Sequence, residues 1–383
     1  MTAAREKLTE LRRLMKEVEV DAYYVPSTDP HNSEYVPACW QRRQWLSGFT
    51  GSAGDLLVTG TMAGLWTDGR YYLQAGRELR GSGIKLFKQG NPGVPTVAEW
   101  LGQHLRSGQV LGVDPRVLSR AAADELEAEL ERAGARIKYV NANLVDRIWR
   151  GRPAPSRAPI EPLPRRFAGE SVAAKLRRVR KEMDRQRADA HVLTALDAIA
   201  WLFNIRSADV DYNPVAIAHA IVHRDRAQLF TNQAKVTPAL QRALGRTVEI
   251  LPYGQIGPAL SALKRADRRV WVDGGTVNMW VLRKLSRCEL VTDPSPITRM
   301  KARKNDAELE GIRAAHVRDG VAMVRFLRWL EQAVPAGEAT ELAASARLAE
   351  LRARGEHFRG ESFESIVGYG AHGAIVHYAV DES

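Results

Sequence analysis

Cysteine is scarce in this chain, which has only Cys39 and Cys288 among its 383 residues. No Cys-x-x-Cys pair occurs, so a zinc site built from paired thiolates is excluded. The two cysteines could form one disulfide bond. Two separate thiols in a reducing compartment are the favoured interpretation.

Long apolar runs are also absent. No stretch approaches the roughly 18 apolar residues that a membrane span needs. The segment 1–10 is charged and lacks an apolar core, so no signal peptide is evident. We therefore expect a cytoplasmic protein with no membrane partner.

Acidic residues are outnumbered, with 45 Asp and Glu against 56 Lys and Arg, and the formal net charge is +11. Such an excess can mark a protein that binds nucleic acid. Here it is spread along the chain, and its densest stretch, 175–187, has the pattern of a solvent-exposed helix face. Because 45% apolar and 26% charged residues are ordinary for a globular protein, we expect a basic enzyme that binds no nucleic acid.

An internal repeat relates the first 300 residues. Seven identities in 23 positions occur at a constant offset of 168: Lys7/Lys175, Leu8/Leu176, Arg12/Arg180, Met15/Met183, Asp21/Asp189, Ala22/Ala190 and Asp29/Asp197. Trp45-Leu46 resembles Trp201-Leu202 at an offset of 156. The order of matches is kept while the offset drifts, which is typical of two copies that differ in loop length. We predict that 1–150 and 165–295 share one topology, with Asp21 equivalent to Asp189 and Trp45 to Trp201.

Each copy has the pattern of a layered α/β domain. In the first copy, apolar residues at helical spacing predict a helix over 8–18, followed by strands at 22–25 and 64–67. A second helix over 97–105 and a strand at 110–113 follow. Alternating helices and strands favour the α/β class.

Proline marks the first boundary. Five prolines between Gly151 and Pro164 cannot continue a helix or a central strand, so this segment is predicted to be a linker. A second boundary lies near 293–296. The predicted domains are 1–152, 165–298 and 299–383.

The third segment has a different pattern. It predicts one long amphipathic helix over 305–330, with Leu309, Ile312, Ala315, Val321, Val324, Leu327 and Leu330 on the apolar face. A second helix over 338–354 and strands at 362–370 and 373–380 are predicted after it. A sheet begun here has little left to pair with, because the printed chain stops at Ser383, and short open sheets are marginal in water.

Two polar loop regions could carry function. The glycine-rich segment 48–54 lacks the Lys-Ser/Thr ending of a phosphate loop, and Ser52 is not in a G-x-S-x-G elbow, so a tight structural turn is favoured. His31, Glu34, Asp68 and Arg70 lie in loops beside aromatic residues. For these four residues, a role in hydrogen-bond networks between domains or subunits is favoured. Contact with a substrate is the alternative, and Arg70 is the candidate substrate-binding residue.

His372 and His377 are the obvious candidates for metal ligands. On a strand, side chains five residues apart point to opposite faces, so the two rings would make a poor chelating pair. No carboxylate at useful spacing accompanies them. From the residues alone, His377 would be a packing residue.

The chain resembles the three-domain Xaa-Pro aminopeptidases (aminopeptidase P) along nearly its whole length. Nine segments in order carry the resemblance: 29–35, 45–54, 66–71, 196–206, 211–215, 304–305, 308–309, 318–320 and 373–378. The resemblance implies two related creatinase-N-terminal-like α/β domains, followed by a catalytic domain of the α+β pita-bread fold. The predicted repeat fits those first two domains.

The resemblance also implies a reaction. The family removes the first residue from peptides with proline in second position, using water activated by two divalent metal ions, usually manganese. Their ligands are two Asp, one His and two Glu. The histidine matching His377 contacts the substrate and is not a metal ligand. Cytosolic members are expected to be homodimers when complete.

None of the five metal ligands can be placed on this sequence, which stops six residues after His377. His372 departs from the Asn or Thr expected in the family, which puts the hydrogen bonding of that loop in question. We therefore expect the incomplete start of the catalytic domain, a truncated chain that binds no metal and is inactive on its own. The alternative is a non-catalytic peptide- or protein-binding member of the pita-bread fold. The nucleotide sequence beyond codon 383 would separate the two.

Overall fold

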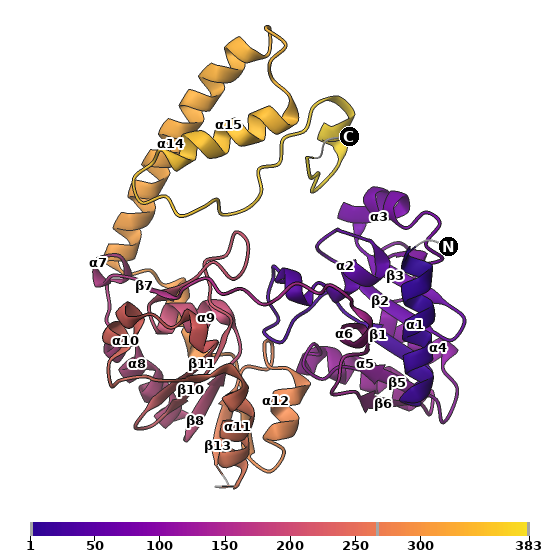
Figure 1. Cartoon of the computed structure of the whole chain (residues 1–383). Helices are drawn as coiled ribbons and strands as arrows, with labels where there is room; N and C mark the ends of the chain where they lie inside the picture. Colours follow the sequence, from indigo (N-terminus) through magenta and orange to yellow (C-terminus); the bar gives the residue numbers. More distant parts are fainter. Residues whose placement is uncertain (1–2, 266–267, 381–383) are drawn as a thin grey trace.

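The computed structural model describes residues 3–265 and 268–380, and Figure 1 shows its three parts. The first part contains a six-stranded sheet in the order β4-β3-β2-β1-β5-β6. Its strands are β1 (Ala22–Val25), β2 (Asp55–Thr59), β3 (Ala63–Thr67), β4 (Lys85–Lys88), β5 (Val110–Val113) and β6 (Arg136–Tyr139). Its helices are α1 (Ala3–Glu17), α2 (Arg42–Ser47), α3 (Tyr72–Glu78), α4 (Val97–His104), α5 (Arg120–Arg132) and α6 (Leu144–Ile148).

The second part contains a six-stranded sheet in the order β12-β11-β10-β8-β13-β14. Its strands are β8 (Ala190–Leu193), β10 (Ala218–His223), β11 (Ala227–Thr231), β12 (Glu249–Pro252), β13 (Arg269–Val272) and β14 (Glu289–Thr292). Its helices are α8 (Val172–Arg185), α9 (Leu196–Leu202), α10 (Pro238–Leu244), α11 (Ile256–Arg265) and α12 (Met279–Lys284).

The two sheets have the same topology, as the repeat predicted. In each, the first strand is antiparallel to the second and parallel to the fifth (β1 with β2 and β5, β8 with β10 and β13). Asp21 and Asp189 occupy equivalent positions. The backbone N–H of each donates to the neighbouring strand, and its carboxylate accepts the N–H of Val110 or Arg269 in return.

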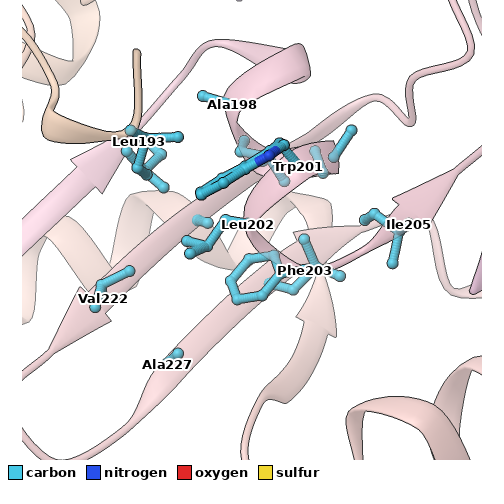
Figure 2. Packing of buried hydrophobic residues seen from close by; sticks show 14 of the residues in the cluster. Leu193, Ala198, Trp201, Leu202, Phe203, Ile205, Val222 and Ala227 are labelled. Atoms are coloured by element: carbon cyan, nitrogen blue, oxygen red, sulfur yellow. The ribbon is translucent and has the colours of Figure 1, made fainter. Parts of the chain in front are cut away.

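Helices cover both faces of each sheet, so each sheet has two apolar cores. In the first part, Leu11 of α1 packs with Leu56 and Leu144 on one face, while Leu101 of α4 and Leu126 of α5 pack on the other. In the second part, the larger core lies under α8 and α9, and α11 and α12 cover the opposite face. Figure 2 shows that larger core, where Trp201, Leu202 and Phe203 lie against strand residues such as Val222 and Ala227.

The predicted linker is mostly irregular and contains the two-residue strand β7 (Glu161–Pro162), which pairs with β9 (Ile205–Arg206). The short helix α7 (Arg165–Ala168) follows it. Both cysteines are present as thiols, as favoured. Among the helices of residues 3–265 and 268–380, none is long and apolar enough to cross a membrane.

One assignment in the basic stretch 175–187 was wrong. Lys175 does not lie on a solvated face, because its side chain is 1% exposed in the core beneath α8. Its ammonium donates to the carbonyl oxygen of Trp201 at 2.9 Å and to the side chain of Asn204 at 2.7 Å. These acceptors make the burial of the charge tolerable.

The helix α13 (Pro296–Ala302) follows β14 and packs on the second part through Ile297. The long helices of the third part are α14 (Asp306–Ala333) and α15 (Glu341–Ala353). Both long helices were predicted. The apolar face expected for α14 is nevertheless largely exposed: Val321, Val324 and Leu327 are 47%, 67% and 54% exposed. The side chains that α14 buries, such as Phe326, instead face α15 and its Leu348.

The two strands predicted at 362–370 and 373–380 were wrong. This segment runs as irregular chain with a 3₁₀ helix at Gly370–Ala374. All strands of the described residues precede Asp293, and none of them pairs with this segment. Ile366 and Val376 are exposed and Ile375 is half-buried. Asp381 and Glu382, expected to fray, lie outside the described residues.

Candidate functional site

A cavity of about 890 Å³ lies where the three parts of the chain approach one another. Loops of the first part, the loop after β9 and the end of the third part all contribute to its wall. Its lining includes Glu34, Arg70, Tyr71, Tyr212, Phe363 and His377. The cavity therefore contains both residues that the sequence proposed for substrate contact, although 307 positions separate Arg70 from His377.

Arg70 is held by its own loop. Asp68 directly follows β3, accepts the backbone N–H of Arg70 at 3.1 Å and so caps the short 3₁₀ helix 69–71. The same carboxylate accepts Nε and Nη2 of Arg70 at 2.8 and 2.7 Å. This hydrogen bonding is the main reason that the pKa of Asp68 is lowered. The bidentate pair fixes the direction of the guanidinium and leaves its Nη1 side outside the pair.

His377 stacks on Tyr71, with ring centroids 5.7 Å apart and an angle of 28° between the planes. Tyr71 is itself fixed, because its hydroxyl shares a hydrogen bond of 2.6 Å with Ser52 and its ring meets the edge of Phe49. The backbone of His377 has a φ of +53°, which few non-glycine residues adopt. A residue of the third part thus rests on an aromatic side chain positioned by the first part.

The glycine-rich segment 48–54 is a structural turn, as favoured. Gly51 lies so close to Phe49 that an added Cβ would come within 2.4 Å of the Phe49 ring. Arg43, which is 6% exposed, donates to the carbonyl oxygens of Phe49 and Gly51 and ties the turn to α2. Burial is the main cause that lowers the pKa of Arg43 to about 10. The turn places Ser52 under Tyr71, which is the role of Ser52 at this site.

His31 belongs to a structural network between the first two parts, as favoured. It is 1% exposed, its Nδ1 lies 2.9 Å from the carbonyl oxygen of Thr194, and its Nε2 lies 2.9 Å from the hydroxyl of Tyr253. Since a carbonyl only accepts, Nδ1 carries the proton and Tyr253 donates to Nε2. Burial lowers the pKa of His31, which keeps the ring neutral and suits this arrangement.

Glu341, which sequence reasoning missed, holds the segment that carries His377. This residue at the start of α15 accepts from the backbone N–H of Tyr369, from Nδ1 of His372 and from the hydroxyl of Tyr378. His372 and Tyr378 also stack, with centroids 4.5 Å apart. No local pattern distinguishes Glu341 from the other acidic residues of its helix. The contact also resolves the question about the loop, because His372 uses Glu341 as its partner.

His372 and His377 do not act as a pair, since one contacts Glu341 and the other Tyr71. Within residues 3–265 and 268–380, no group of three or more His, Cys, Asp or Glu side chains is arranged to hold a metal ion. The donor set present in these residues therefore does not fit a two-metal centre.

Comparison with known families divides the chain in the same way. Residues 7–148 and 151–308 each match a model described as creatinase/prolidase N-terminal domain, and residues 310–383 match metallopeptidase family M24.

Relatives match over nearly the whole chain. "Probable Xaa-Pro aminopeptidase P" of Neosartorya fischeri is 39% identical over 97% of this chain and 59% of its own length. "Aminopeptidase P2" of Arabidopsis thaliana is 39% identical over 97% of this chain and 57% of its own length. The crystal structure of an X-prolyl aminopeptidase from Caenorhabditis elegans, described as a cytosolic enzyme with a di-nuclear active site, superposes with a TM-score of 0.95 at 34% identity. The superposition covers all of this chain and 65% of the C. elegans one.

Two creatinase-type α/β domains followed by the start of an M24 pita-bread domain define the class of this protein. In sequence and fold, the chain is similar to the Xaa-Pro aminopeptidases over nearly its whole length. It spans between 57% and 65% of the length of the relatives described above.

Proposed function

We propose that this chain is the substrate-positioning portion of an Xaa-Pro aminopeptidase, which releases the first residue from peptides with proline in second position. The observation that carries the proposal is the meeting of Arg70, Tyr71 and His377 in one cavity built from all three parts of the chain. The similarity to Xaa-Pro aminopeptidases supports the reaction class, and the cavity has room for a peptide.

In this proposal His377 positions the substrate and does not bind metal. Its ring is supported on one side by Tyr71, and an imidazole so placed can donate to or accept from a peptide carbonyl or amide. Arg70 is proposed to bind the peptide through the Nη1 side of its guanidinium, because its Nε and Nη2 are used by Asp68. Both residues would act by orienting the peptide.

The attacking water is assigned to no described residue of this chain. We propose that a longer form with the family's carboxylate ligands would hold two divalent ions, manganese being favoured by hard oxygen ligands. We further propose that the 383-residue chain alone does not hydrolyse peptides. The support is that acidic residues of the third part, such as Glu308 and Glu341, are used in capping and loop contacts.

The proposal also includes a cellular location and an oligomeric state. A cytoplasmic location is supported by the C. elegans relative, which is described as cytosolic. A homodimer is proposed for the longer form.

The test is an assay of the purified 383-residue chain with an Xaa-Pro tripeptide and added manganese. The expected result is no release of the N-terminal residue above buffer. Turnover well above buffer, with close to two metal ions per chain by elemental analysis, would contradict the inactivity. A longer form that binds the tripeptide without cleaving it, even when loaded with metal, would favour the binding-protein alternative.

A further inference from the structure

A second cavity, of about 580 Å³, lies between the first two parts of the chain. The first part contributes the loop after β5 and the start of α6. The second part contributes residues of β10, of the 3₁₀ helix 253–255 and of α12. Its lining is distinct from that of the substrate cavity, except that Trp40 and Arg42 line both.

Arginine dominates the charges of this second cavity. Arg42, Arg116, Arg147 and Arg152 line it, against the two carboxylates Asp114 and Asp146. The lining side chains therefore carry an excess of two positive charges. Guanidinium groups are the side chains best suited to oxyanions, because their N–H groups form a planar fork.

The arginines are held in place before any ligand arrives. Asp146 accepts Nε and Nη2 of Arg42 at 2.7 and 2.9 Å and also pairs with Arg152 at 2.8 Å. Arg116 donates to the carbonyl oxygen of Asn141 and lies over the ring of Trp280, 4.9 Å from its centroid. Arg147 reaches Glu17 at the exposed rim. Groups fixed in this way lose little freedom on binding.

Two buried polar atoms on the lining side chains have no hydrogen-bond partner within the described residues. One is Nη1 of Arg42, on a side chain that is 7% exposed, and the other is Nδ1 of His219, on a residue that is 3% exposed. His219 is held between the rings of His31 and Tyr253. An unpaired buried polar group is destabilising, so each such group in a native protein needs an explanation.

We propose that this cavity binds a small dianion with oxyanion groups, either a phosphate monoester or a dicarboxylate. Its two negative charges would balance the excess of the lining arginines, and its oxygens would offer acceptors near Arg42 and Arg116. The ligand would touch both of the first two parts at once, so its binding would stabilise their relative placement. The proposal is independent of the peptidase function.

Isothermal titration calorimetry on the 383-residue chain, at constant ionic strength set with chloride, tests this with two probes. Inorganic phosphate represents the phosphate source, and succinate represents the dicarboxylate source. One-to-one binding of either probe supports the site and names the source. Arg116→Gln should weaken that binding by about tenfold, as expected for loss of a charged hydrogen bond. Arg147→Gln at the rim should weaken it by about threefold.

Arg246→Gln is the matched control, since it removes the same charge from an exposed position outside the cavity. It should leave the binding unchanged. Arg147 is 42% exposed, so its variant tests the site even if Arg116→Gln does not fold. The proposal fails if neither anion binds one to one, or if Arg246→Gln weakens binding as much as the cavity variants do.

Discussion

The ammonium of Lys175 lies 4.0 Å from the centroid of the Trp201 ring and donates to the carbonyl oxygen of the same residue. Lys7 makes the same two contacts with Trp45, at 4.4 Å from the ring and 2.6 Å from the carbonyl oxygen. The two pairs were matched from the sequence at different offsets, and the structure joins them in each copy. The copies differ in burial, because Lys175 lies in a core whereas Lys7 is half-buried.

This difference in burial predicts that replacing Lys175 lowers the free energy of unfolding more than replacing Lys7 does. Lys175→Met should lower the free energy of unfolding by about 2–4 kcal/mol, because it leaves the buried Asn204 side chain and the Trp201 carbonyl without their donor. Lys7→Met should cost about 1 kcal/mol or less, since solvent can replace the ammonium there. Urea denaturation of both variants checks the prediction, and equal losses would contradict it.

Lys175 also predicts a pH dependence of stability. Burial is the main cause that lowers its pKa from 10.5 to about 8 in the folded protein. Between pH 8 and 10.5 the unfolded chain binds more protons at this site than the folded chain, so this group makes the protein more stable as pH rises. The free energy of unfolding is measured against pH for the unmodified chain and for Lys175→Met. The difference between the two should rise from pH 8 to pH 10.5. A flat difference would show that the ammonium titrates normally.

Gly51 and Gly76 form a matched pair for backbone substitution. Gly51→Ala should destabilise the protein by about 1–3 kcal/mol, because the new Cβ would overlap the ring of Phe49. Gly76→Ala, in α3 with nothing within 4 Å, should be stabilising by about 0.5–1 kcal/mol. Thermal unfolding followed by circular dichroism measures both. Equal effects would mean that the turn at 48–54 is not as tightly packed as described.

Glu341 predicts local order in the segment that carries His377. Glu341→Gln should increase hydrogen exchange at the amide of Tyr369, because a neutral amide is a weaker acceptor than the carboxylate. The hydrogen bond from that N–H is the main cause that lowers the pKa of Glu341, so the contact should also weaken as pH falls through this lowered pKa. Glu310→Gln in α14 is the control and should leave exchange at Tyr369 unchanged.

His377 can be tested in a longer form that carries a complete M24 domain. His377→Ala should lower kcat by about tenfold to a hundredfold while the metal content stays unchanged, as expected for a positioning group. His104→Ala, in α4 and remote from the cavity, is the control. Loss of bound metal in the His377 variant would show that the residue is a ligand instead.

Local sequence pattern was sufficient for the repeat, for the helices and strands predicted at 8–18, 22–25, 64–67, 97–105 and 110–113, and for both long helices of the third part. These features depend on the spacing of apolar residues, and that spacing is written in the sequence whatever the rest of the chain does. Local pattern did not predict β2, β4 or β6. The motif order was likewise sufficient for the family, because nine short segments in a fixed order rarely arise by chance.

The burial of individual side chains and the contacts between distant segments could not be predicted from the sequence and are seen only in the folded chain. Lys175 was assigned to a solvated face because a lysine on a helix usually lies there, yet the acceptors supplied by Trp201 and Asn204 allow it inside. The buried side of α14 depended on where α15 packs. Whether the segment 362–380 formed a strand depended on pairing with another strand, and no described strand pairs with it. The meeting of Arg70 and His377 has the same origin. No pattern of neighbouring residues encodes a contact across 307 positions, since it results from how all three parts pack.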